Sequence, residues 1–179
     1  MWIIIVVIVV IVAIIFFSKR ENIDKEKQEL ILDALEHSKK ESLTSMLNEW
    51  TLKINWKFHK WQTMLIMASM MWKPDMVKFL IEKWAKVNTK DNDWWVALSY
   101  AYASVLNRIV SSTTAKEVGK ILLDNWANPN IKNRDWRTPL FFAIWIGRKD
   151  ILDDLDKHWA NWDVRDNRWF SPRMIRDCK

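Results

Sequence analysis

Tryptophans recur along this chain at a fixed spacing, which restricts the fold to a stack of similar units. Two sets of tryptophans carry the spacing, namely Trp61, Trp94, Trp136 and Trp169 in one set, and Trp84, Trp126 and Trp159 in the other. The sequence numbers of neighbours within each set differ by 33, except across one interval in each set, where the difference is 42. One repeat is therefore nine residues longer than the others, since 42 exceeds 33 by nine. A period of about 20–50 residues is typical of solenoids and related arrays, in which each unit packs on the next.

The segment from Thr138 to Ala143 has the features of a helix start. A threonine at the N-cap accepts a hydrogen bond from a free N–H group of the first turn. Proline suits the first helical position because it has no N–H group to lose. Leu140 and Ala143 are three residues apart, so they face the same side of a helix. The motif predicts a helix that begins at Pro139 and buries Leu140 and Ala143.

This motif and its period resemble those of ankyrin repeats, which have a T-P-L-H-x-A pattern and a period of about 33 residues. Phe141 stands where the family pattern has histidine. Thr63-Met64-Leu65 is a closer copy of the motif than Val96-Ala97-Leu98, because valine cannot cap a helix. The resemblance implies an all-α ankyrin-repeat solenoid of helix-turn-helix units that are joined by β-hairpin-like loops.

The repeats divide residues 28–177 into segments. They are an N-terminal cap at 28–57, repeats at 58–90, 91–132 and 133–165, and a C-terminal cap at 166–177. Proline at position 74 predicts the start of the second helix in the first repeat. The extra residues of the longer repeat fall between its two helices, at about residues 106–114. There, Thr114-Ala-Lys-Glu117 fits a capping box, which predicts a helix that starts at Thr114.

Residues 2–17 contain no polar side chain. As a helix they would span about 24 Å, and the flanking Ser18, Lys19 and Arg20 can extend that length toward a bilayer core of about 30 Å. We predict a transmembrane anchor at residues 2–18 and a juxtamembrane linker at 19–27. Because the basic residues follow the apolar run, the positive-inside rule predicts a single-pass protein with a cytoplasmic repeat domain. A cleaved signal peptide and a buried strand are the alternatives.

The chain has only 2 glycines but 14 tryptophans, and these two anomalies have one explanation. The ankyrin pattern has glycine at eight positions where this sequence has tryptophan, namely 61, 72, 84, 94, 126, 136, 159 and 169. A residue with a Cβ atom loses about 1–2 kcal/mol in the left-handed conformation that turns after helices commonly adopt. Eight such sites would cost about 8–16 kcal/mol, as much as the stability of a whole domain, about 5–15 kcal/mol.

We therefore predict that most of these tryptophans are glycines in the cell. Some bacteria decode UGA as glycine, whereas a common alternative code decodes it as tryptophan, so translation with the wrong table would produce this pattern. Trp95 is the expected exception, because an aromatic residue is common at that position of ankyrin repeats. Trp145 and Trp162 stay undecided. The alternative is a genuine tryptophan-rich protein.

Catalytic and metal-binding motifs are absent from the sequence. It has no phosphate-binding loop, no H-E-x-x-H and no G-x-S-x-G motif, and its three histidines have no ligand spacing. The single cysteine, Cys178, excludes a disulfide within the chain. We expect no enzymatic activity, cofactor, metal, nucleic acid or small-molecule substrate. The net charge is +6, and many cations fall in the loops between repeats, where they form a solvated rim or an edge for an acidic partner or anionic lipid.

The ankyrin resemblance implies that a protein partner binds the hairpin loops and the exposed side of the first helices. The corresponding residues are His59, Lys60, Gln62, Met70, Met71, Asn92, Asp93, Trp95, Arg134, Asp135, Arg137, Trp145, Ile146, Asn167, Arg168 and Phe170, with Ala103 and Ser104 at equivalent positions. Four of them, Met70, Met71, Trp145 and Ile146, would expose apolar surface unless the register buries them. The predicted function is that of a membrane-tethered adaptor or scaffold. An inhibitor or immunity-type protein that blocks an enzyme or toxin, and a purely structural solenoid, are the alternatives.

Overall fold

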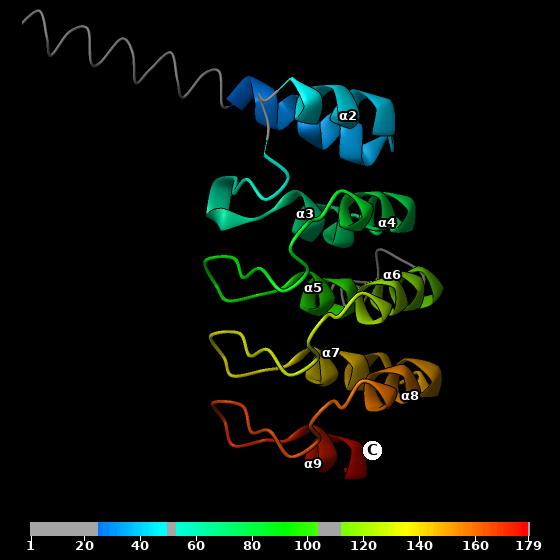
Figure 1. The fold of residues 1–179 in the computed structure, drawn as a ribbon. Helices are drawn as coiled ribbons and strands as arrows, with labels where there is room; N and C mark the ends of the chain where they lie inside the picture. Colours follow the sequence, from blue (N-terminus) through cyan, green and yellow to red (C-terminus); the bar gives the residue numbers. More distant parts are fainter. Residues whose placement is uncertain (1–24, 50–52, 104–111, 179) are drawn as a thin grey trace, which may run out of the picture.

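The computed structural model describes residues 25–49, 53–103 and 112–178 as an elongated stack of helices (Figure 1). The predicted anchor at residues 2–18 lies outside the described part of the chain. Within the part that is described, no helix combines the length and the apolar character needed to cross a membrane. Residues 25–27, the described part of the predicted linker, are helical and continue into the helix that ends at residue 36.

Helices account for all regular secondary structure in the described residues. After the helical stretch at 25–36 come α2 (Lys40–Asn48), the short 3-10 turn η1 (His59–Trp61), α3 (Met64–Met70), α4 (Pro74–Glu82), α5 (Ala97–Ala103), α6 (Ser112–Asp124), α7 (Pro139–Ile146), α8 (Lys149–Lys157) and α9 (Pro172–Asp177). The all-α prediction is confirmed for this part of the chain. The loops between helix pairs contain no strand there.

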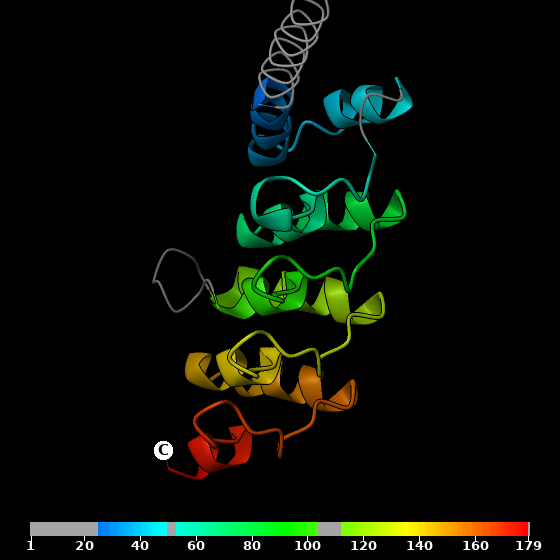
Figure 2. The ribbon, with the colours of Figure 1, turned by 90° about the vertical axis from the view of Figure 1, so that its left-hand side faces the viewer.

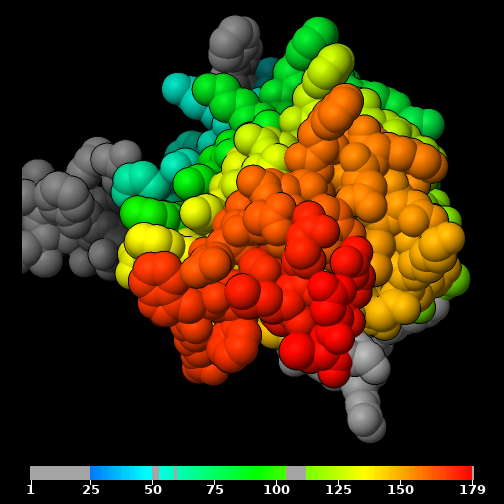
Figure 3. All heavy atoms as spheres, turned by 90° about the horizontal axis from the view of Figure 1, so that it is seen from below, coloured from blue at the N-terminus to red at the C-terminus, as the bar shows by residue number. Residues whose placement is uncertain are grey.

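The helices form two parallel rows along the stack. One row consists of α3, α5, α7 and α9, each of which packs against the next, and the other consists of α4, α6 and α8. The loops that precede the first helix of each pair all project toward the same side (Figures 1 and 2). Viewed along the stack, successive repeats lie behind one another with a progressive offset (Figure 3). This arrangement buries one continuous core between layers.

The repeated motif supplies that core. Leu65, Leu98 and Leu140 occupy the same place in successive repeats, and none is more than 1% exposed. Each side chain that is buried in this way stabilises the fold by about 1.5–3 kcal/mol. Ala68 and Ala143 are fully buried at the second motif position. The prediction that Leu140 and Ala143 share the core-facing side of one helix is confirmed.

The helix caps follow the prediction only in part. Helices α4, α7 and α9 each begin at a proline, as expected for a residue without an N–H group. The Thr63 hydroxyl accepts a hydrogen bond from the Ile66 N–H group at 3.3 Å. The Thr138 side chain, in contrast, makes no capping bond, and its buried hydroxyl has no partner. A threonine at the N-cap position therefore does not always form a capping hydrogen bond.

Helix α6 begins earlier than the sequence suggested. It starts at Ser112, so Thr114 lies inside the first turn, and the prediction of a start at Thr114 is wrong. The Ser112 hydroxyl accepts a hydrogen bond from the Arg148 guanidinium at 3.1 Å, which ties this helix start to the neighbouring repeat. Residues 106–111 of the expected insertion lie outside the described part of the chain.

The eight tryptophans at expected glycine positions all have a left-handed backbone. Their φ angles run from 48° at Trp72 to 67° at Trp84 and Trp169. The real glycine at the corresponding turn of the third repeat, Gly147, has a φ angle of 74°. Trp95 and Trp145, which were not assigned to such turns, do not have positive φ angles. The predicted left-handed turns are therefore present at the positions that the repeat register gave.

Candidate functional site

Tight hairpins position the candidate surface, and an acidic or amide side chain closes each one. In the hairpin at 91–95, Oδ1 of Asp91 accepts hydrogen bonds from the N–H groups of Asp93 and Trp95, both at 2.9 Å. The Asp91 N–H group also donates to the Trp95 carbonyl at 3.0 Å. Asn133 and Asp166 make the same three bonds in their hairpins. These three hydrogen bonds fix the backbone of each hairpin, and so fix the position of the residue that follows the turn.

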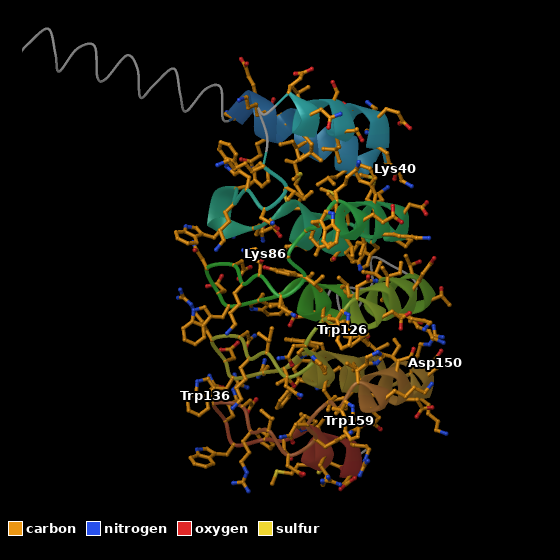
Figure 4. The ribbon with its side chains drawn as sticks, in the orientation of Figure 1. Lys40, Lys86, Trp126, Trp136, Asp150 and Trp159 are labelled. Carbon is orange, nitrogen blue, oxygen red and sulfur yellow. The ribbon has the colours of Figure 1, made fainter. Side chains whose placement is uncertain are left out.

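Backbone hydrogen bonds link the tips of successive hairpins. The donors and acceptors are Asn92 N–H to the Lys60 carbonyl at 3.0 Å, Arg134 N–H to the Asp93 carbonyl at 3.2 Å, and Asn167 N–H to the Asp135 carbonyl at 3.0 Å. These bonds fix each tip relative to the next. Figure 4 shows one of the tip side chains, Trp136, at the outer end of its loop. The hairpins therefore form a single edge of the stack.

Four aromatic side chains form a continuous row across two repeats, here called the aromatic row. The Trp95 ring lies 5.1 Å from the Tyr100 ring and 4.8 Å from the Phe142 ring, between centroids. The Phe142 ring meets the Trp145 ring edge to face at 5.8 Å. Aromatic pairs at these separations attract one another beyond simple burial. The row joins one hairpin to the first helices of the second and third repeats.

Polar contacts extend the aromatic row toward the N-terminal end of the stack. The Gln62 amide donates to the Tyr100 hydroxyl at 3.3 Å, and that hydroxyl donates to Oδ2 of Asp91 at 2.7 Å. Burial raises the pKa of Tyr100, and the hydrogen bond to the Asp91 carboxylate raises it further. The phenol therefore stays protonated as a donor near neutral pH.

An arginine extends the row toward the C-terminal end. The Arg137 guanidinium lies over the Trp145 ring, 5.3 Å from its centroid. Its Nε donates to the buried Asp166 carboxylate at 3.2 Å. The side chains from Gln62 to Asp166 thus form an unbroken chain of contacts from the first clear repeat to the C-terminal cap.

The residues predicted to bind a partner have two levels of exposure in the structure. Exposed residues are Lys60, Asn92, Asp93, Arg134, Asp135, Trp145, Asn167, Arg168 and Phe170, whereas Gln62, Met70, Met71, Trp95, Ala103, Arg137 and Ile146 are half-buried. The His59 side chain and Ser104 lie outside the described part. Of the four apolar residues expected at the surface, only Trp145 is exposed, at 37%. Met70, Met71 and Ile146 pack against the core instead.

Tyr100 and Phe142 were not among the residues predicted to form the site. Both lie at the same repeat position, since their sequence numbers differ by 42, as those of Trp94 and Trp136 do, and both follow a hairpin residue of the site by five positions. That equivalence was available from the repeat register. Their aromatic character alone gave no reason to place them in the site, and Phe142 is indeed buried, at 4% exposure, while Tyr100 is half-buried.

A stack of helix pairs in which each layer contacts its neighbours is the architecture of a repeat protein. A family model for ankyrin repeats in many copies matches residues 114–155, which run from α6 into α8. The match supports the ankyrin-repeat interpretation on this part of the chain. Ankyrin repeats generally mediate protein–protein interactions and are typically non-enzymatic. A search of curated proteins found no match to this chain.

Proposed function

We propose that this protein is a membrane-tethered ankyrin-repeat adaptor, which binds a protein partner through the aromatic row and the adjoining hairpins. The observation that supports this best is the unbroken contact chain from Gln62 to Asp166. Its exposed and half-buried members, Gln62, Trp95, Tyr100, Arg137 and Trp145, present side chains of successive repeats to a partner, whereas the buried Phe142 and Asp166 hold them in place. A fold of this kind offers no enzymatic site by itself, so the function lies in the side chains of that surface.

The composition and rigidity of the row suit partner binding. Tryptophan, tyrosine and arginine dominate the energetics of protein interfaces. Trp145 is 37% exposed and Phe170 is 54% exposed, so a partner would remove apolar surface from water. Trp95 and Arg137 are held by neighbouring rings and by Asp166, so little side-chain entropy remains to be lost on binding.

Membrane tethering is supported by the sequence alone. The sixteen residues 2–17 are apolar, and Lys19 and Arg20 follow them. In this proposal the helical array lies on the cytoplasmic face, close to the bilayer, because only a short segment separates the anchor from the helix at 25–36. A partner that meets the aromatic row would therefore be a membrane protein or a protein recruited to the membrane.

The test is affinity capture from native membranes with two matched double variants. Trp145→Ala/Phe170→Ala removes two exposed apolar side chains from the site. Leu30→Ala/Met174→Ala removes two others, which are 55% and 43% exposed and lie outside the aromatic row. Because hot-spot truncations cost about 2 kcal/mol or more, we expect the site variant to lose at least about 90% of a partner that the control retains.

A partner that is captured equally by the wild type and by both double variants would contradict the proposed site. Circular dichroism of both variants checks that the helices remain. The alternative function, an inhibitor or immunity-type protein, is distinguished by the identity of the captured protein. An enzyme or toxin whose activity falls on binding would favour the inhibitor over the adaptor.

We also propose that the eight left-handed tryptophans are glycines in the cell. Support comes from their positive φ angles and from the exposure of the indoles, which reaches 89% at Trp126. The indole N–H of Trp72 is buried without a hydrogen-bond partner. An unsatisfied buried donor of this kind costs about 1–3 kcal/mol. Glycine at these turns removes the strain, the exposed apolar area and the unsatisfied donor together.

A further inference from the structure

One edge of the stack carries a column of cations that recurs once per repeat. Its members, here called the basic edge, are Lys57, Lys90, Lys132 and Arg165, which recur with the same spacing as the hairpin tryptophans. Each lies over the tryptophan ring at its own hairpin, with distances to the ring centroid of 4.5, 5.2, 5.3 and 5.8 Å in that order. The hairpins that carry them lie on the left of Figure 1 and toward the viewer in Figure 2.

The charge on this edge is largely unneutralised. Lys60 and Arg168 add two exposed cations at the hairpin tips. Within the described residues, neither they nor the four members of the basic edge form an ion pair with a carboxylate. Of the two exposed carboxylates at the hairpin tips, Asp93 pairs with Arg134 at 3.6 Å, and Asp135 accepts a hydrogen bond from the neutral Asn167 amide, so cations outnumber carboxylates along this edge. The edge therefore attracts an external anion.

Helix α8, on another side of the stack, carries charges of both signs. Asp153 and Asp156 are exposed there, as are Lys149 and Lys157, and Asp150 is paired with Arg148 and Lys116. Figure 4 shows Asp150 on the side of the stack away from the hairpin that carries Trp136. This uneven distribution of charge gives the molecule a preferred orientation in an electric field. A negatively charged surface would attract the hairpin side more strongly than the side of α8.

We propose that the basic edge lies against anionic lipid headgroups of the membrane to which residues 2–18 tether the chain. The surface of an anionic bilayer attracts Lys and Arg side chains that lie within about one Debye length of it. A bilayer is favoured over an acidic protein because backbone bonds fix the hairpin tips in one edge, so cations of successive repeats reach one broad surface together. This proposal rests on the membrane tether of the proposed function. It depends only on the cations of the basic edge, so it holds whether the hairpin tips carry tryptophan or glycine.

This orientation leaves the two surfaces of the molecule with different roles. The cations of the basic edge meet the lipid headgroups, while the aromatic row, which runs from the hairpin at 91–95 onto α5 and α7, stays available to a partner. Each cation near an anionic surface contributes a factor of about five in binding. Four cations together are enough to favour one orientation of an array that the anchor already confines near the membrane.

The test measures how fast each lysine of the full-length protein reacts with a membrane-impermeant acetylating reagent, read by peptide mass spectrometry. The protein is reconstituted in vesicles of phosphatidylcholine alone, or with about one third phosphatidylglycerol. We expect Lys57, Lys90 and Lys132 to react at least about threefold more slowly in the anionic vesicles. About 0.5 M salt should abolish this protection, because it shortens the screening length to about 4 Å.

Two matched variants separate a lipid-facing edge from a general effect of charge. Lys57→Gln/Lys90→Gln/Lys132→Gln should remove the protection of Lys60 in anionic vesicles. Lys78→Gln/Lys83→Gln/Lys149→Gln changes the net charge equally on helices α4 and α8, and should leave Lys60 protected. Equal reaction rates of the edge lysines in both kinds of vesicle, or equal protection of Lys78, would overturn the proposal.

The same samples show which of two proposals is wrong, the membrane tether or the lipid-facing basic edge. A full-length protein that does not float with neutral vesicles lacks the anchor, and the lysine pattern is then measured with anionic vesicles added from outside. Protection confined to the basic edge would keep the lipid-facing proposal without the tether. Flotation without such protection would keep the tether and reject the lipid-facing edge.

Discussion

At the residue scale, backbone conformation separates two groups of tryptophans. Those at the repeat turns have positive φ angles, and all of them except the half-buried Trp72 have exposed side chains, of which Trp126 is an example. Trp95 and Trp145 do not have positive φ angles and take part in ring contacts. The first group therefore adds backbone strain with little packing in return, whereas the second group stabilises a surface.

Single substitutions in the two groups should have opposite effects on stability. Trp126→Gly removes a left-handed residue with a Cβ, and we expect it to stabilise the fold by about 1 kcal/mol. Trp145→Gly places glycine in helix α7 and removes the contacts with Phe142 and Arg137, so it should destabilise by at least about 1 kcal/mol. Urea unfolding midpoints of the two variants test this. A lower midpoint for Trp126→Gly would contradict the strain argument.

At the scale of elements, sequence patterns predicted the helices better than their contacts. Proline and the core leucine located the starts of α4 and α7, because proline geometry and apolar periodicity are local properties. The start of α6 was mispredicted, since the capping-box pattern carries no information about the contact between Ser112 and Arg148. The aromatic row was only half predicted, because ring contacts between repeats depend on how the layers pack.

An ion-pair cluster joins two of these elements. The Asp150 carboxylate on α8 contacts the Arg148 guanidinium at 2.6 Å and the Lys116 ammonium of α6 at 2.9 Å. The hydrogen bonds from Arg148 and then from Lys116 hold the pKa of Asp150 well below its usual range. A carboxyl group with a lowered pKa in the folded state stabilises the fold above its unfolded pKa, about 3.9. That contribution is lost as the pH falls through the lower folded pKa.

Asp150→Asn should therefore reduce thermal stability at pH 7 more than at pH 2. The difference in melting temperature between this variant and the wild type should shrink as the solution is acidified. Asp153→Asn is the matched control, because Asp153 is exposed on the same helix. We expect the control to melt close to the wild type throughout. A gap for Asp150→Asn that stays constant between pH 7 and pH 2 would rule out this role for the cluster.

At the scale of the whole molecule, the repeat register accounts for the stacked layers and the placement of both candidate surfaces. Equivalent positions in successive repeats give the buried leucines, the linked hairpin tips and the column of cations. In a solenoid each layer contacts only its neighbours, so a surface row spanning several layers depends on every turn between them. The left-handed turns therefore position the proposed binding surface as well as the helices.

The central claim is that this register places eight left-handed turns where the sequence has tryptophan, and that those residues are glycines in the native protein. Mass spectrometry of the intact protein from its natural source tests it most directly. Each replacement of tryptophan by glycine lowers the mass by about 129 Da, so we predict a mass about 1.0 kDa below the 21.6 kDa of the sequence. Peptide spectra should place glycine at 61, 72, 84, 94, 126, 136, 159 and 169, and retain tryptophan at 95. A native mass that matches 21.6 kDa would contradict the claim, and would show that the turns tolerate tryptophan.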